Sequence, residues 1–117
     1  MITQLVDSNV DAMMKSDKAS FILFHDDKMP SLDSIKKVFE GFDEKLQGKV
    51  NIMYCDIDNE KYVNEYFQMR TLPAVLFVKG GKIYGNLAGP ASASKYEDIL
   101  KSALQQLIGE QGKWSFP

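Results

Sequence analysis

The chain alternates short, densely apolar stretches with longer stretches in which apolar residues recur every three or four positions. Short apolar runs between polar boundaries are typical of strands, and the longer periodicity is typical of amphipathic helices. The clearest predicted strand is Phe21–His25, a run whose continuous apolar character is typical of a strand covered on both faces. The clearest predicted helix begins at Ser31 and ends near Gln47, with Gly48 as its stop.

The same patterns assign the rest of the chain. Further strands are predicted at 2–6, 50–57, 74–78 and 82–87. Further helices are predicted at 9–16, starting at Ser8; at 60–67, capped by Asp58 or Asn59; and from a cap at Ser92 or Ser94 to about 108. Two glycines, at positions 80 and 81, predict a tight hairpin between the last two strands.

The resulting order is strand-helix-strand-helix-strand-helix-strand-strand-helix. Helices between the early strands require parallel crossovers, whereas the late hairpin requires an antiparallel pair. We therefore expect an α/β fold in which a mixed sheet carries helices on both faces. A length of 117 residues, with 44% hydrophobic and 26% charged residues, indicates one domain, at 1–108. The polar tail, 109–117, carries Trp114 and Phe116, which either pack on the domain, anchor a partner or fray.

Charge and hydropathy exclude several classes of partner. Fourteen Lys and Arg against sixteen Asp and Glu give a net charge of −2, so no basic patch for nucleic acid is expected. No apolar run approaches the roughly 20 residues that span a bilayer, and no basic segment precedes an apolar one at the start of the chain. These patterns predict a soluble cytoplasmic protein that binds neither nucleic acid nor membranes.

Several stretches together resemble the thioredoxin family over about residues 20–104. They are Phe21-Ile22-Leu23-Phe24, Asp56-Ile57-Asp58, Arg70-Thr71-Leu72-Pro73, the hairpin Phe77-Val78-Lys79-Gly80-Gly81-Lys82, and Gly89. The resemblance implies a thioredoxin fold with a cis peptide bond before Pro73.

The reactive residues of that family are absent. Where the family carries its Cys-Gly-Pro-Cys, this chain reads Met29-Pro30-Ser31-Leu32. By the same resemblance, Leu23 stands at the family's buried acid and His25 at an aromatic. Thiol–disulfide exchange needs a thiolate, which neither a thioether nor an isobutyl group supplies. No dithiol oxidoreductase activity, catalytic residue or cofactor is therefore expected.

The single cysteine, Cys55, forms no internal disulfide, dithiol couple or structural zinc site by itself. It falls in the middle of a predicted strand, on the same face as Met53 and Ile57, where a buried apolar role is expected. The enzymatic alternative is a monothiol or glutathione-linked protein that uses Cys55.

Three further motifs are weighed against structural roles. His25-Asp26-Asp27 suggests a metal site or a general base, but consecutive residues of an extended segment point in alternate directions, so a solvated turn is favoured. The acidic run 56–60 lacks the glycine and the length of an EF-hand loop, so helix capping is favoured over calcium. The hairpin glycines lack the framing of a phosphate loop. No metal site is predicted.

The functional prediction therefore concerns a surface. If the fold is correct, five residues converge at one end of the sheet: Met29, Pro30, Leu72, Pro73 and Gly89. In redox-active relatives, the resemblance implies, this groove holds a substrate peptide through the residue before the cis-proline. We expect a redox-inactive thioredoxin-like protein that binds a protein or peptide partner as an adaptor, accessory subunit or chaperone-like module. A retained scaffold without binding, and a purely structural subunit or homodimer, remain the alternatives.

Overall fold

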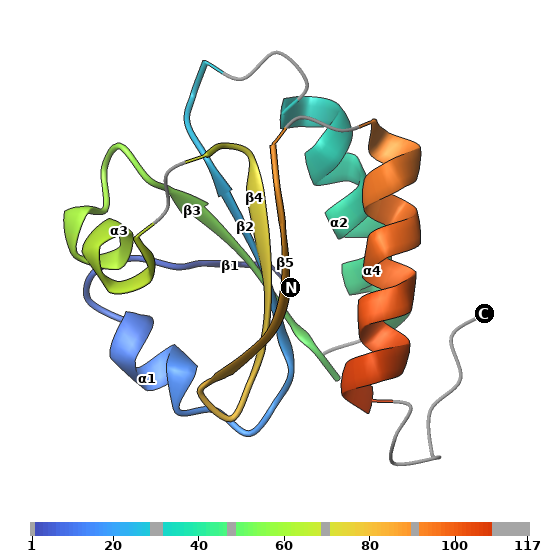
Figure 1. Ribbon diagram of the computed structural model, residues 1–117, viewed down its shortest axis with the longest axis horizontal. Coiled ribbons are helices and arrows are strands. Elements are labelled where there is room, and N and C mark those ends of the chain that lie inside the picture. Colours follow the sequence, from blue (N-terminus) through green and yellow to red (C-terminus); the bar gives the residue numbers. More distant parts are fainter. Residues whose placement is uncertain (1, 29–31, 47–48, 69–70, 90–91, 109–117) are drawn as a thin grey trace.

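The computed structural model describes residues 2–28, 32–46, 49–68, 71–89 and 92–108 of the chain. The elements follow the predicted order (Figure 1). The strands are β1 (Thr3–Gln4), β2 (Ser20–His25), β3 (Asn51–Asp56), β4 (Ala74–Lys79) and β5 (Lys82–Ala88). The helices are α1 (Val10–Met14), α2 (Leu32–Leu46), α3 (Lys61–Phe67) and α4 (Ala93–Ile108).

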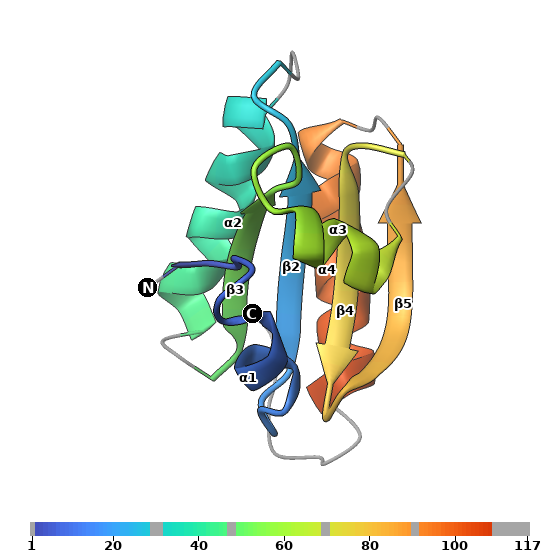
Figure 2. The same cartoon turned by 90° about the vertical axis from the view of Figure 1, so that its left-hand side faces the viewer.

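The described strands form one five-stranded sheet in the order β1-β3-β2-β4-β5. Strands β1, β3 and β2 are parallel, β4 runs antiparallel to β2, and β5 runs antiparallel to β4. Figure 2 shows β2, β4 and β5 side by side with this reversal of direction. The predicted mixed sheet, with a parallel part followed by an antiparallel hairpin, is confirmed.

Helices cover both faces of the sheet. Helices α2 and α4 lie on one face and α1 and α3 on the other (Figures 1 and 2). Because side chains alternate along a strand, β2 supplies both layers: Phe21 and Leu23 join the α2–α4 layer, and Ile22 and Phe24 join the α1–α3 layer. All four are fully buried, which explains why the sequence of β2 is a continuous apolar run.

The first strand and the first helix are shorter than predicted. Strand β1 spans only Thr3–Gln4, and α1 ends at Met14. The Asn9 side chain explains the early end of the strand: its Oδ1 accepts a hydrogen bond from the Val6 amide at 2.9 Å, and its Nδ2 donates to the Gln4 carbonyl at 2.9 Å. The chain is thereby held in a turn where a longer strand was expected.

The start of α3 corrects a second prediction. Neither Asp58 nor Asn59 caps this helix; Asp56 binds both, accepting from the Asp58 amide and the Asn59 side-chain amide. The Val63 amide in the first turn of α3 instead donates to Oδ1 of Asp7 at 2.9 Å. The cap comes from a loop more than fifty residues away, which local sequence rules do not consider.

The other local signals are confirmed. Gly80 and Gly81 have φ values of +58° and +78°, the left-handed conformations that a two-residue hairpin requires. The Ser92 hydroxyl accepts from the Lys95 amide at 3.2 Å and so caps α4. Within the parts of the chain described above, no helix combines the length and apolar character needed to cross a membrane.

Candidate functional site at the end of the sheet

The candidate site lies where four strands meet at one edge. In the sheet, His25 at the end of β2 is in register with Asp56 at the end of β3. On the other side of β2, Phe24 pairs with Ala74, and Ala74 pairs with Ala88 at the end of β5. Pro73 precedes β4, so it lies one residue beyond the Phe24–Ala74 pair, alongside His25. The carboxyl ends of parallel strands are the usual place for binding sites in α/β folds.

The predicted peptide-binding residues that the structure describes are Leu72, Pro73 and Gly89, and we call them the Pro73 surface. The Leu72–Pro73 peptide bond is cis, as the family resemblance implied. The Pro73 carbonyl accepts a hydrogen bond from the Gly89 amide at 2.8 Å, which brings the loop before β4 against the end of β5. Gly89 has a φ of +98°, a conformation that favours glycine. Met29, Pro30 and Ser31 lie outside the described residues.

The backbone of Leu72 is unpaired within this part of the molecule. Neither its amide nor its carbonyl makes a hydrogen bond to another described residue. The Leu72 side chain is half-buried and packs against the α1–α3 layer. Leu32, the last of the four positions that the resemblance placed at the family's cysteine motif, begins α2 and packs against the α2–α4 layer.

Cys55 has no exposed surface and lies in the α1–α3 layer together with Met53 and Ile57, as predicted. Burial raises the pKa of its thiol to about 12, and the nearby carboxylates of Glu60, Asp56 and Asp7 add to this effect. A reactive cysteine has a lowered pKa and partial exposure. The environment of Cys55 has neither property.

The structure assembles a group that the sequence analysis did not combine. Ligating atoms of His25, Asp27 and Asp56 all lie within 4.8 Å of one another. Asp26 is not part of this group; its Oδ1 accepts a hydrogen bond from the Lys28 amide at 2.9 Å, whereas Asp27, in the turn that follows β2, joins His25. Asp56 then enters from the neighbouring strand. The sequence contains a sign of this group, because two predicted strands end near His25 and Asp56. To combine the two residues, however, one must know that these strands are neighbours and in which register they pair.

Electrostatics within this group are dominated by the two carboxyl groups. A side-chain hydrogen bond with Asp56, and the charge of Asp56, raise the pKa of the Asp27 carboxyl, while His25 acts in the opposite direction. Neither Asp27 nor Asp56 forms a salt bridge with a lysine or arginine among the described residues. The two carboxyl groups are thus joined by a hydrogen bond, and within the described residues no lysine or arginine is paired with either.

A separate hollow of about 430 Å³ lies between α2 and α4. Its lining residues come from these two helices: Ser34, Lys37, Val38, Gly41, Phe42, Lys45, Ala93 and Glu97. It shares no residue with the Pro73 surface or with the group around His25.

Comparison with known protein families agrees with the architecture. The thioredoxin family model matches residues 2–102, which is most of the chain. The chain therefore belongs to the thioredoxin family, and its sheet and helices form a thioredoxin-like fold. It is a member with a single cysteine, located in the interior of β3 and buried in the α1–α3 layer.

Proposed function

We propose that this chain is a redox-inactive thioredoxin-family protein that binds a protein or peptide partner through the Pro73 surface, as an adaptor, accessory subunit or chaperone-like module. The observation that carries the proposal is the unpaired backbone of Leu72 beside the strand ends, as far as the described residues extend. Backbone amides and carbonyls are strong hydrogen-bonding groups, and an extended peptide satisfies them by pairing as an additional strand would.

The side chains around this backbone support a binding role. Leu72 offers a half-buried apolar side chain next to its own amide and carbonyl, neither of which is paired with another residue that the structure describes. Gly89 lies close by through its hydrogen bond to Pro73 and has no side chain to obstruct a peptide. Backbone pairing supplies affinity without demanding a particular sequence, and the apolar side chain adds preference for an apolar residue.

The absence of a reactive thiol separates this proposal from the enzymatic alternative. The chain carries Met29 and Leu32 at the positions of the family's cysteines, and its one thiol is buried in another layer. In an insulin-reduction assay coupled to thioredoxin reductase, we expect turnover no higher than that of a Cys55→Ala control. Turnover that is clearly higher in the wild-type protein contradicts a redox-inactive role.

The binding surface is tested by a matched pair of substitutions. Leu72→Asp places a charge on the Pro73 surface, whereas Ile83→Asp makes the same change at a residue that is 54% exposed on β5. Both variants are first checked for an unchanged thermal melting curve. Proteins captured from a host extract are then compared quantitatively among the wild type and the two variants, and the partner found is titrated by calorimetry.

We expect Leu72→Asp to weaken binding of that partner at least about tenfold, because a desolvated carboxylate opposes an apolar contact. Ile83→Asp should leave the affinity unchanged. Equal affinity for all three proteins, or no protein captured above the level of the bare support, contradicts the proposal.

A further inference from the structure

The cluster at the ends of β2 and β3 has a chemistry that the Pro73 surface does not use. One imidazole and two carboxylates converge there, with all ligating atoms within 4.8 Å. His25 and Asp56 are paired in parallel register, which places their side chains on the same face of the sheet. Asp27 lies in the turn that follows β2, and this turn brings its carboxylate to the same group. Two of the three residues are thus placed by adjacent strands, and the third by the turn after β2.

The His25 ring is held firmly while one of its nitrogens stays available. The residue is only 4% exposed, and its ring packs edge-on against Tyr54, with centroids 6.4 Å apart. Tyr54 is itself fixed, since its hydroxyl donates to the Lys36 carbonyl at 3.0 Å. Nδ1 of His25 lies 3.3 Å from the backbone carbonyl of Asp26. A proton on Nδ1 satisfies that carbonyl and leaves the lone pair of the other nitrogen free.

The second ring nitrogen has no hydrogen-bond partner among the described residues. One nitrogen of the ring belongs to the set of ligating atoms that lie within 4.8 Å of one another. An imidazole oriented by a backbone carbonyl through one nitrogen, with the other nitrogen open, is the arrangement found in histidines that bind metals.

The two carboxylates of the group, Asp56 and Asp27, differ in how firmly they are held. Asp56 is oriented by two donors, the Asp58 amide at 3.2 Å to Oδ1 and the Asn59 side-chain amide at 2.7 Å to Oδ2. Such outer contacts fix a ligating carboxylate. Asp27 is exposed, and its carboxyl group shares a hydrogen bond with Asp56. Ligands around one ion lie about 3–3.5 Å apart, given bond lengths near 2.1 Å, so the three ligating atoms, which lie within 4.8 Å of one another, move closer together when an ion binds.

We propose that His25, Asp27 and Asp56 bind a divalent zinc-class metal ion at the ends of β2 and β3. One nitrogen and two carboxylate oxygens match the ligands that Zn²⁺ accepts, and solvent completes the coordination. Calcium and magnesium prefer oxygen ligands alone, which makes the imidazole a poor choice for them. The metal also supplies the cation that the two carboxylates lack in this part of the structure. This inference does not depend on the proposed function.

The chain offers an unusually clear readout, because His25 is its only histidine. In the full-length protein, Zn²⁺ is titrated by calorimetry while the imidazole signals are followed by NMR, with Mg²⁺ and Ca²⁺ in parallel. We expect one saturable Zn²⁺ site, a change in the His25 ring signals at the same stoichiometry, and much weaker responses to Mg²⁺ and Ca²⁺.

Two substitutions locate the ion without removing the buried histidine. Asp27→Asn keeps the size of an exposed side chain and should weaken Zn²⁺ binding at least about tenfold. Asp26→Asn removes the same charge from the adjacent residue, which lies outside the group, and should change the affinity less than twofold.

The absence of saturable Zn²⁺ binding overturns the proposal. So does binding that leaves the His25 signals unchanged, or binding that Asp27→Asn and Asp26→Asn weaken equally. In the last case the ion responds to the overall negative charge rather than to this group. A preference for Mg²⁺ or Ca²⁺ over Zn²⁺ also contradicts the proposed ligand set.

Discussion

Burial sets the chemistry of the Cys55 side chain. It packs beside Met53 and Ile57 without exposed surface, and the nearby carboxylates oppose a second negative charge. Both effects keep the sulfur protonated. The buried apolar role that the sequence predicted for Cys55 therefore has a physical basis. Placing a thiolate in an apolar layer costs free energy, so the side chain stays a neutral thiol.

Modification of the thiol tests this environment. At pH 8, raising the pKa from 9.0 to about 12 reduces the thiolate population by about a thousandfold. We expect Ellman's reagent to react with the folded protein at least that much more slowly than with the protein in guanidinium. Rapid stoichiometric labelling of the folded protein would restore the monothiol alternative.

The same pKa shift predicts a loss of stability at alkaline pH. As the pH rises above 9, the unfolded chain loses the Cys55 proton first, because the folded state holds it until about pH 12. Deprotonation then favours unfolding, so the free energy of unfolding falls between pH 9 and 12 by up to about 1.4 kcal/mol per pH unit. Below pH 8 the thiol contributes no slope.

Urea unfolding at several pH values measures this effect, with Cys55→Ala as the comparison. Burial also raises the pKa of Tyr54 and Tyr96, so both proteins should lose stability at high pH. The wild-type protein should lose it more steeply than Cys55→Ala. Identical slopes would show that the thiol is not held protonated.

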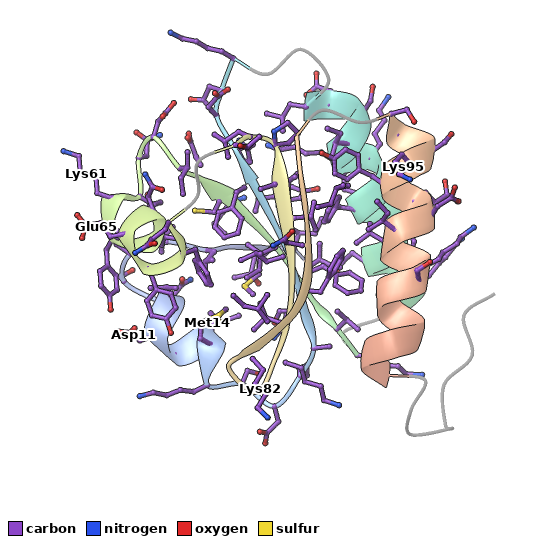
Figure 3. All side chains as sticks on the ribbon, in the orientation of Figure 1. Asp11, Met14, Lys61, Glu65, Lys82 and Lys95 are labelled. Carbon is purple, nitrogen blue, oxygen red and sulfur yellow. The ribbon has the colours of Figure 1, made fainter. Side chains whose placement is uncertain are left out.

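Helix α3 is an element whose start depends on a distant loop. The Asp7 carboxylate accepts a hydrogen bond from the Val63 amide. In the other direction, the Glu60 carboxylate accepts a hydrogen bond from the Asp7 backbone amide at 2.8 Å. The Tyr62 hydroxyl donates to Asp11 on α1 at 3.0 Å, which joins the two helices a second time. In Figure 3, Lys61 and Glu65 project from α3 away from the sheet, while Asp11 lies on the neighbouring α1.

Removal of this cap should destabilise the whole protein measurably. We expect Asp7→Ala to lower the free energy of unfolding by about 1 kcal/mol, in the range found for helix caps. Glu60→Ala should cost less, and the double variant should cost less than the sum, because the two hydrogen bonds join the same two segments and each helps to hold the other in place. Asp17→Ala, at an exposed acidic residue, serves as the control in urea unfolding. Full additivity of the two changes would contradict the reciprocal arrangement.

Elements with local causes could be predicted from the sequence, and those with distant causes could not. The glycine hairpin and the Ser92 cap depend on neighbouring residues and appear where expected. The α3 cap depends on Asp7. Similarly, His25 and Asp56 form a pair only through the register of two strands, which the sequence predicted as separate elements.

At the scale of the whole molecule, two apolar layers share one sheet. Phe39 on α2 is fully buried in one layer, and Phe24 on β2 is fully buried in the other. Adjacent residues of β2 alternate between the layers, so neither layer loses its packing without disturbing the strand that both use. Cooperative unfolding of the domain follows from this shared strand.

Large-to-small changes in either layer test that coupling. Phe24→Ala and Phe39→Ala should each cost about 3–5 kcal/mol, a large share of the 5–15 kcal/mol typical of a domain. Unfolding followed by far-UV circular dichroism and by tyrosine fluorescence should stay a single coincident transition for both variants. Ile83→Ala, at an exposed site, should change stability by less than about 0.5 kcal/mol. Separate transitions for the two probes would show that the layers unfold independently.

The position of β1 has a consequence for any shortened form of the protein. This strand lies at the end of the sheet, where it pairs with β3 through two residues, Thr3 with Met53 and Gln4 with Tyr54, and the Leu5 amide adds a bond to the Tyr54 carbonyl. A form that starts after Asp7 would leave β3 as an open edge and would also lose the α3 cap. Exposed edges of long apolar strands pair with other chains. Residues 3–7 therefore cover an edge of β3 that would otherwise be open to pairing with another chain.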